Sequence, residues 1–304
     1  MVLPDRPAHV VASPATGYPG TGPGLDAQGS GISATTLRDH TVNGKQPDPQ
    51  LLDHDELILV TAGHGSHDID FVTYPCRPGT LLRARAGQVV WPGGQPGLDA
   101  VIVRWPARNG GQPADPYGAV RWQLAGEDED AIINEVSQLV VDTQRPRRSP
   151  LIDDLLRHQL RVLLVRIALL PTGDADAANS GSRQEPPDVG EGSSRWVTFR
   201  RFRYEVERDY ARTRRVEAYA ERLQCAVRTL TRASLTVTGR TAKQIIDDRV
   251  MLQAKRLLAA TDQPVAEVGQ LLGFAEPTNF GRFVQREIGH SPGAFRAAVR
   301  GQHR

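Results

Sequence analysis

Apolar residues recur at helical spacing near the end of the chain. Between Val265 and Arg296 the valines, leucines and phenylalanines stand three and four residues apart, and the pattern breaks at Leu272–Phe274. It resumes on a segment that carries Thr278 and Arg282 on its polar side. Because this spacing marks one face of a helix, it predicts two short helices joined by a glycine-containing turn. The second helix of such a helix-turn-helix unit can enter the major groove of DNA.

A weaker copy of the pattern lies upstream, between Val216 and Gly239. In this copy Leu230 is predicted to point inward, whereas Arg228 and Arg232 stand four residues apart and share an outward face. Residues 195–304 all read as helical. The sequence therefore predicts an all-helical C-terminal domain that contains two helix-turn-helix units in tandem.

The first half of the chain shows a different pattern, in which short apolar runs are separated by glycine and proline. Short runs punctuated by turn residues are typical of strands in an antiparallel sandwich or barrel. The predicted strands contain Leu57–Val60, Phe71–Tyr74, Thr80–Leu82, Gln88–Trp91 and Ala100–Val103.

Two helices are predicted after these strands. The first begins in the acidic run Glu127–Asp130, because negative charge suits a helix N-terminus, and it carries Ile133, Val136 and Val140 on one face. The second spans residues 151–170, and its large aliphatic residues repeat four and three apart as a heptad-like seam. We predict that this seam pairs two protomers; the alternative is that it packs only on its own barrel. The seam consists of Leu156, Leu160, Leu163, Ile167 and Leu170.

Composition divides the chain into four parts. Residues 1–35 are rich in Gly, Pro, Ser and Thr, and we expect a flexible arm over residues 1–50. A sensor and dimerisation domain is predicted over residues 51–170, followed by a polar linker over 171–194 and the helical domain over 195–304. The predicted fold class is α+β with two domains, an N-terminal β-barrel with a helical dimerisation segment and a C-terminal all-α domain.

Charge is distributed unevenly along these parts. Residues 1–150 hold 12 Lys/Arg and 17 Asp/Glu, a balance of −5, and residues 151–194 hold 4 and 7, a balance of −3. Residues 195–304 hold 21 and 11, a balance of +10. The basic charge therefore coincides with the helix-turn-helix units, as expected if only that third of the chain meets a polyanion.

The residues give little support to a secreted protein, a membrane protein or an enzyme. Cys76 and Cys225 are far apart and form no metal or disulfide pattern, which fits a reducing cytosol. The N-terminus has no apolar signal region and no apolar run is long enough to span a membrane, so we expect a cytoplasmic protein without a membrane partner. Residue order gives no Ser-His-Asp grouping, phosphate loop or carboxylate pair, and we predict no catalytic residue and no cofactor.

A specific set of residues marks the two helix-turn-helix units and the helix between them. The downstream unit has Leu272-Gly273-Phe274, Asn279-Phe280, Arg282-Phe283, Gly289, Ser291-Pro292 and Phe295-Arg296, and the connecting helix has Thr241, Ile246, Arg249, Ala254 and Leu257-Leu258. With these residues the segment from about Val216 to Arg296 resembles the DNA-binding domain of the AraC/XylS family of transcription regulators. The resemblance implies that the two recognition helices enter successive major-groove faces, roughly 34 Å apart along the DNA.

The outward residues of both recognition helices are the predicted DNA contacts. Arginine can bond O6 and N7 of guanine together, and each such pair is worth about 1–3 kcal/mol of base discrimination. Asn279 could equally bond locally within the turn, and Arg249 on the connecting helix is expected to be structural. The predicted contacts are Arg228, Thr229, Arg232, Pro277, Thr278, Asn279 and Arg282.

Two departures from the family pattern concern the turns. The family often has a serine that caps each recognition helix, and the corresponding residues here are expected to be Ala226 and Ala275. Replacing an N-cap serine by alanine costs about 0.5–2 kcal/mol of helix stability. The first unit also has Gln224 where its turn usually carries glycine. These differences affect the local geometry of the first unit and leave the predicted fold intact.

The N-terminal region carries turn-rich segments at Tyr74-Pro75, Arg77–Thr80 and Ala86–Gln88. With them, residues from Leu57 to about Trp105 resemble the cupin-like sensor barrel of many AraC-family regulators. The resemblance implies that the barrel binds a small effector and that the following helices pair protomers. Three tryptophans could line an effector pocket or be plain core; they are Trp91, Trp105 and Trp122.

His64 and His67 raise the question of a metal site, because enzymatic cupins hold a metal with histidines and a carboxylate. Positions i and i+3 of a strand point to opposite faces, and no third ligand is evident. We therefore expect surface histidines and no bound metal.

Together these observations predict a bacterial transcription regulator that binds double-stranded promoter DNA as a homodimer. A small-molecule effector and RNA polymerase are its further expected partners. One alternative is a regulator controlled by a protein partner or by its abundance, with an effectorless barrel. The alternative from another class is a cupin enzyme with an accessory helical domain.

Overall fold

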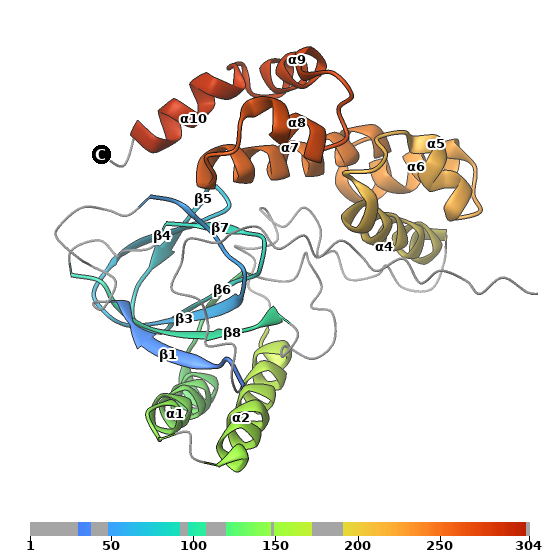
Figure 1. The fold of residues 1–304 in the computed structure, drawn as a ribbon. Helices are drawn as coiled ribbons and strands as arrows, with labels where there is room; N and C mark the ends of the chain where they lie inside the picture. Colours follow the sequence, from blue (N-terminus) through green and yellow to red (C-terminus); the bar gives the residue numbers. More distant parts are fainter. Residues whose placement is uncertain are drawn as a thin grey trace, which may run out of the picture.

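The computed structural model describes residues 30–37, 48–91, 97–107, 120–146, 149–171 and 191–301. Figure 1 shows two sheets that enclose a barrel, a helix pair on one side of it, and a set of helices on the opposite side. The predicted α+β architecture, an N-terminal barrel followed by C-terminal helices, is confirmed in this arrangement. Among the described residues, no helix combines the length and apolarity needed to cross a membrane.

A five-stranded sheet forms one wall of the barrel. Its strands lie in the order β1-β8-β3-β6-β9, and each neighbouring pair is antiparallel. The strands are β1 (Ser33–Thr36), β3 (Asp55–Ala62), β6 (Thr80–Ala84), β8 (Asp99–Trp105) and β9 (Arg121–Gln123). Strand β1 lies within the range expected to be a flexible arm. Its Ser-Ala-Thr-Thr sequence has no large apolar residue and so gave no strand pattern, but its backbone pairs with β8.

The opposite wall is a four-stranded sheet in the order β2-β7-β4-β5. Its strands are β2 (Gln50–Leu51), β4 (Gly65–Ile69), β5 (Val72–Cys76) and β7 (Val89–Val90). Strands β4 and β5 form a hairpin in which Ile69 pairs with Val72. The two residues between them, Asp70 and Phe71, have φ angles of 52° and 67°. Phe71, which the sequence pattern placed in a strand, is therefore in the turn.

The barrel interior lies between the two sheets and is mostly aliphatic. Side chains alternate along each strand, so that Ile58 and Val60 of β3 point inward while Leu57 and Leu59 point to the outer face. From the opposite sheet Ile69 points into the same apolar cluster. This cluster joins the two walls and fixes the barrel.

Helices α1 (Gly126–Thr143) and α2 (Pro150–Leu169) cover the outer face of the five-stranded sheet (Figure 1). On α1, Val136 is buried and Val140 packs against the same cluster, as predicted, whereas Ile132 is fully buried in place of the predicted Ile133, which is 39% exposed. On α2, Ser149 caps the N-terminus by accepting a hydrogen bond from the backbone N–H of Leu151. Pro150 follows at the first helical position, where its missing N–H costs nothing.

The aliphatic seam of α2 packs within its own domain. Leu156, Leu160 and Leu163 are 0% exposed and Ile167 is 2% exposed, all in one cluster with the sheet and α1. Buried side chains cannot contact a second protomer without unfolding the domain. The prediction that these four residues form the dimerisation surface is therefore wrong, and the alternative considered for them holds.

The C-terminal part consists only of helices in the described residues up to Gly301. Helix α4 begins inside the predicted linker, most of which lies outside the described residues. The helices are α4 (Glu191–Asp209), α5 (Val216–Arg222), α6 (Val227–Thr238), α7 (Ala242–Ala260), α8 (Val265–Leu271), α9 (Pro277–Ile288) and α10 (Pro292–Gly301).

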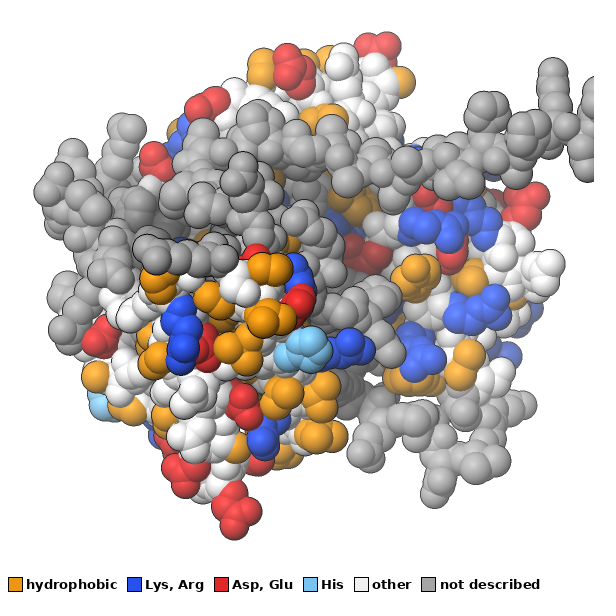
Figure 2. All heavy atoms as spheres, turned by 60° about the horizontal axis from the view of Figure 1, so that its bottom comes forward, with side chains coloured by type: hydrophobic (Ala, Val, Ile, Leu, Met, Phe, Trp, Pro, Cys, Tyr) orange, Lys and Arg blue, Asp and Glu red, His pale blue; other side chains and the backbone are white. Residues whose placement is uncertain are grey.

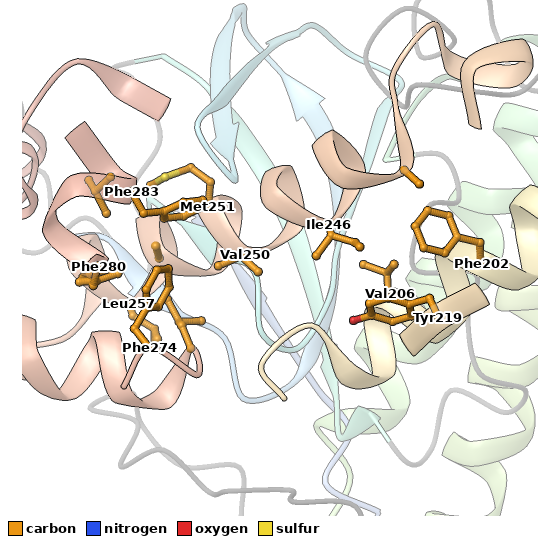
Figure 3. Packing of buried hydrophobic residues seen from close by; sticks show 14 of the residues in the cluster. Phe202, Val206, Tyr219, Ile246, Val250, Met251, Leu257, Phe274, Phe280 and Phe283 are labelled. Atoms are coloured by element: carbon orange, nitrogen blue, oxygen red, sulfur yellow. The ribbon is translucent and has the colours of Figure 1, made fainter. Parts of the chain in front are cut away.

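One apolar cluster joins six of these helices around α7 (Figure 3). At one end Ile246 lies near Phe202 of α4 and Tyr219 of α5, and at the other end Leu257 lies near Phe280 of α9. Thr241 caps α7, and Gln244 completes a capping box with it. Helix α7 is therefore the common support of both helix-turn-helix units.

Helix α10 is fixed to the C-terminal end of α7 by two arginines. Arg296 donates to the carbonyl oxygens of Leu258 and Gln263, at 3.1 and 2.6 Å. Arg300 donates to those of Ala259 and Thr261, at 3.3 and 2.8 Å. The last carbonyls of a helix lack intrahelical partners and carry partial negative charge, so guanidinium groups suit this position.

Candidate nucleic-acid interface

Both predicted helix-turn-helix units are present, as α5–α6 and α8–α9. Their second helices show the same burial pattern with an offset of 50 residues. Leu230, Ala233 and Ser234 of α6 are buried, as are Phe280, Phe283 and Val284 of α9. Each helix therefore presents an equivalent outer face. All seven predicted contact residues lie on these two faces and are exposed, namely Arg228, Thr229, Arg232, Pro277, Thr278, Asn279 and Arg282.

The turns of the two units share a left-handed residue two positions after the first helix. This residue is Gly273 in the second unit, with φ of 76°, and Gln224 in the first, with φ of 53°. A Cβ atom at Gly273 would come within 2.4 Å of the Ala211 carbonyl oxygen, so the second turn requires glycine. Gln224 adopts the same backbone region at the position where the family usually has glycine.

The second turn is one residue longer than the first. Ala226 is the N-cap of α6, as predicted, and makes no side-chain cap. The N-cap of α9 is Glu276, not the predicted Ala275, because the helix begins at Pro277, and this side chain does not cap either. Both recognition helices therefore begin with backbone N–H groups that no side-chain cap satisfies.

The arginines on the two outer faces differ from those elsewhere in the domain. Within the described part of the chain, Arg228, Arg232 and Arg282 make no hydrogen bond or ion pair. Arg249 of α7, in contrast, donates from Nε to both carboxylate oxygens of Glu207 at 2.8 Å, and it lies 3.9 Å from the ring centre of Tyr210. Arg249 is therefore structural, as expected, while Arg228, Arg232 and Arg282 keep their guanidinium groups available to a ligand; Arg286, also on α9, is paired with Glu287.

A hollow of about 810 Å³ borders α9 and the N-terminal part of α7. Its basic lining includes Arg282 and four residues that the sequence pattern did not indicate, Arg214, Arg240, Lys243 and Arg286. These residues come from separate elements, so no spacing in the sequence brings them together. Three carboxylates share the lining and partly neutralise it; they are Asp247, Asp248 and Glu287.

Arg214 occupies one wall of this hollow. Its guanidinium lies 3.5 Å from the ring centre of Phe274, in the turn of the second unit. Burial lowers the pKa of Arg214, opposed by the charge of Asp247, but an arginine remains protonated at any physiological pH. The residue therefore carries charge against the turn that positions α9.

A second candidate site lies inside the barrel. Glu56 shares the inward side of β3 with Ile58, and Arg104 of β8 donates to it at 3.2 Å. His67 of β4 faces them from the other sheet; its side chain is buried and its Nε2 atom has no hydrogen-bond partner. A polar group of this kind inside an aliphatic barrel is a candidate binding site for a small molecule.

The charges of this polar group are balanced. Burial acts to raise the pKa of Glu56, but the His54 imidazole, whose Nε2 lies 3.7 Å from a Glu56 carboxylate oxygen, and the charge of Arg104 outweigh it and lower that pKa. Burial lowers the pKa of His67, with the charge of Glu56 opposing the shift. Glu56 is therefore ionised and paired with Arg104, and His67 is neutral at neutral pH.

The structure corrects one expectation about the barrel and decides another. His64 is exposed, as predicted, but His67, in strand β4, is buried. Trp105 and Trp122 pack against the helix pair, and Trp91 packs against the C-terminal helices, so the three tryptophans do not line the interior. Within the described ranges, no three His, Cys, Asp or Glu side chains are arranged to hold a metal ion.

The family model described as a helix-turn-helix domain matches residues 219–298, which contain both units. No match was found among the curated proteins.

Several solved structures are similar. The DNA-binding domain of AdpA, a global transcriptional factor solved in complex with a target DNA, is 33% identical over 33% of this chain and 88% of that chain, with a TM-score of 0.30. ToxT of Vibrio cholerae bound to an unsaturated fatty acid is 11% identical over 89% of this chain and 95% of that chain, with a TM-score of 0.41. The AraC-like transcriptional activator CuxR is 14% identical over 75% and 76%, with a TM-score of 0.28.

Proposed function

Because the chain belongs to the AraC/XylS family of DNA-binding transcription regulators, we propose that it reads a promoter site as a homodimer under control of a small effector. The observation that carries the proposal is the pair of recognition helices whose outer arginines have no partner in the described structure. We further propose that the chain has no catalytic activity and works in the cytoplasm, with RNA polymerase as its partner at the promoter.

DNA reading is assigned to seven residues: Arg228, Thr229, Arg232, Pro277, Thr278, Asn279 and Arg282. The test is selection of bound duplexes from a random pool by the full chain, followed by titration at several salt concentrations. We expect an enriched sequence and an affinity that falls steeply with salt, because phosphate contacts release counterions. A folded chain that enriches no sequence and binds no duplex at low salt would contradict the proposal.

A second aliphatic stripe of α2 replaces the buried seam as the proposed dimer surface. Leu151 is 73% exposed, Val165 55% and Leu169 79%, and the stripe also contains Leu155 and Val162. Neighbouring members of the stripe stand three, four or seven residues apart, and they lie on the side of α2 opposite the seam. Figure 2, which brings the α1–α2 side of the barrel forward, shows hydrophobic side chains gathered there.

An antiparallel arrangement of the two copies is proposed from the opposite charges at the ends of α2. Asp153 and Asp154 lie near the N-terminal end and Arg161 and Arg166 toward the C-terminal end; within one protomer Asp154 pairs with Arg157, and Arg166 with Glu135 of α1. In an antiparallel pair the acidic end of one helix meets the basic end of the other, and the aliphatic stripe meets itself. A two-fold interface of this kind uses the same patch on both protomers.

The test of the dimer is sedimentation of the variant with Leu155→Glu and Val162→Glu. These residues are 42% and 44% exposed, so the variant is expected to fold and to sediment as a monomer. The matched control is Val141→Glu on α1, which is 54% exposed and lies outside the stripe. An unaltered chain that is monomeric at tens of micromolar would remove the dimer from the proposal.

The proposed effector site is the polar group formed by Glu56, Arg104 and His67. Because Glu56 and Arg104 neutralise each other and His67 is neutral, a neutral molecule with hydroxyl, lactone or amide groups suits the site better than an anion. The test is the melting temperature of the full chain with a panel of neutral polyols, lactones and amides beside matched carboxylates.

We expect a neutral compound to raise the melting temperature and His67→Ala to abolish that increase. A shift produced only by carboxylates would contradict the ligand class. Absence of any shift would favour the alternative, a regulator controlled by a protein partner or by its abundance.

A further inference from the structure

The C-terminal helices contact the barrel through one small apolar cluster. Val89 and Trp91 lie on the barrel side, and Ala259 of α7 and Val299 of α10 lie on the other side. All four are less than a tenth exposed. In Figure 1 the lower end of α7 lies directly above β5 and β7. The tip of the β4–β5 hairpin is part of this contact, through Phe71.

Asp70, the first residue of the tip, binds both parts of the molecule. Its carboxylate accepts from Arg256 of α7 in a paired arrangement, from Nε at 2.8 Å and from Nη2 at 2.5 Å. The same carboxylate accepts from Gln88 Nε2 at 2.6 Å and from the backbone N–H of Val89 at 3.0 Å. The ion pair is well shielded, since the two side chains are 10% and 11% exposed.

Phe71, the second residue of the tip, lies between aromatic side chains of both parts. Its ring centre is 5.4 Å from that of Trp91 on the barrel and 5.9 Å from that of Phe295 on α10. The ammonium of Lys255 on α7 lies 5.8 Å from the same ring centre. Asp70 and Phe71 therefore make polar and apolar contacts to the DNA-binding domain side by side.

The backbone of the tip is unfavourable for these residues. A two-residue hairpin with positive φ at both central positions suits Asn-Gly or Asp-Gly, and a bulky residue such as phenylalanine rarely adopts this conformation. Glycine in place of Phe71 would suit the turn better. The phenylalanine is explained by what its ring contacts on the other domain rather than by the needs of the hairpin.

The strand beside the tip touches the barrel interior and the DNA-binding domain at once. Val89 points outward into the contact with α7 and α10, whereas Val90 points inward to the aliphatic interior with Ile69. Ile69 directly precedes Asp70. A change in what fills the interior therefore acts on the residues next to the tip.

We propose that the β4–β5 tip, Asp70 and Phe71, is a positioning joint that holds the DNA-binding domain in one orientation on the barrel and transmits changes of the barrel interior to it. The transmission and the site-spacing test below rest on the proposed effector and dimer, while the joint itself does not. In a dimer, a fixed orientation allows one separation of the two bound DNA segments, and a loose joint allows several.

The joint is tested by amide hydrogen exchange of the full chain in two variants. Each variant has its substitution on one side of the contact, and its exchange is measured on the other side. Arg256→Gln changes the DNA-binding domain and is read on the hairpin, residues 65–76. Phe71→Gly changes the barrel and keeps a turn that glycine favours. For this variant, amide exchange is measured on residues 250–262. We expect exchange to be faster by about tenfold or more on the side that was not mutated, because local opening becomes easier.

The control for Arg256→Gln is Arg240→Gln, the same change just before the start of α7. It breaks an ion pair with Asp248 inside the DNA-binding domain and should leave residues 65–76 unchanged. Unchanged exchange across the interface in both test variants would overturn the joint. If Arg256→Gln does not fold, Phe71→Gly alone decides.

The consequence for DNA is tested with the selected site duplicated at varied separations. The unaltered chain should prefer one separation, and Phe71→Gly should accept several while keeping the same base preference within each segment. If the unaltered chain and the Phe71→Gly variant preferred the same single separation, the positioning role would be overturned. If the unaltered chain selected no DNA, the proposed function would fail, but the exchange result would still decide whether the joint exists.

Discussion

The sharpest test of DNA reading is the replacement of one recognition arginine, Arg282→Ala. The side chain is exposed and makes no hydrogen bond or ion pair among the described residues. Its loss should therefore change the free energy of unfolding by no more than about 0.5 kcal/mol, as for other surface substitutions. Any loss of DNA affinity can then be attributed to the interface.

The size of the expected loss follows from the contact that the residue is proposed to make. A bidentate bond to guanine is worth about 1–3 kcal/mol of discrimination. This corresponds to a dissociation constant raised about 5- to 150-fold at the selected site. Arg232 occupies the equivalent position 50 residues earlier, so Arg232→Ala should cause a loss of similar size at a base in the other major-groove segment.

The assay is a titration of each variant against duplexes that differ at single base pairs. A base contact predicts that the mutant loses preference at one base pair only. A phosphate contact predicts equal loss on every duplex and a salt slope lowered by about one. Arg249→Ala is the control, because this residue is held by Glu207. It should lower stability and leave base preference unchanged. Equal loss on all duplexes for Arg282→Ala would refute base reading by this residue.

Three further substitutions test the folded structure. Phe280→Ala should lower the free energy of unfolding by about 3–5 kcal/mol in urea titration, because the ring is fully buried against Phe274; a loss below 1 kcal/mol would contradict the packing. Ala226→Ser should raise it by about 0.5–2 kcal/mol by capping α6, whereas Ala275→Ser should not, since it precedes the N-cap of α9. His67→Gln should reduce the loss of stability below pH 6.5: the pKa of His67 is lowered on folding, so the unfolded chain takes up its proton first as pH falls. An unchanged pH profile would speak against a buried neutral histidine.

Periodicity in the sequence was sufficient to predict five of the described strands and both helix-turn-helix units. The predicted strands correspond to β3, β5, β6, β7 and β8, and the recognition helices bury the phenylalanines and leucine that were expected inside. These elements could be predicted because one face of each is apolar and the other is polar. The glycine of the second turn added a backbone signal that few other residues give.

Periodicity could not decide between two faces that are both aliphatic. On α2 the residues of the seam are four and three apart, and those of the exposed stripe are four, seven, three and four apart, so both fit one face of a helix. Only the position of the sheet shows that Leu160 is covered and Leu169 is not. Strand β1 was missed for a related reason, since its small polar residues give no pattern and its backbone pairing with β8 defines it.

Contacts between distant residues were outside the reach of the sequence. Asp70 and Arg256 are 186 positions apart, and neither belongs to a motif. The turn that holds Asp70 carries phenylalanine where a hairpin usually has glycine, so its position was assigned to a strand. The basic residues around the hollow beside α9 were missed because they come from several elements.

The length of α7 has a consequence for how the chain measures DNA. At about 1.5 Å per residue, its 19 residues act as a rigid ruler of about 28 Å between the two units. Adding one residue to its middle would turn everything beyond it by about 100°, and the second recognition helix would then point away from the groove. In the proposed function, the number of base pairs between the two segments that one protomer reads is thus set by a residue count. A regulator of this design changes its target by altering side chains, whereas a change in the length of the ruler breaks the helical phase with DNA.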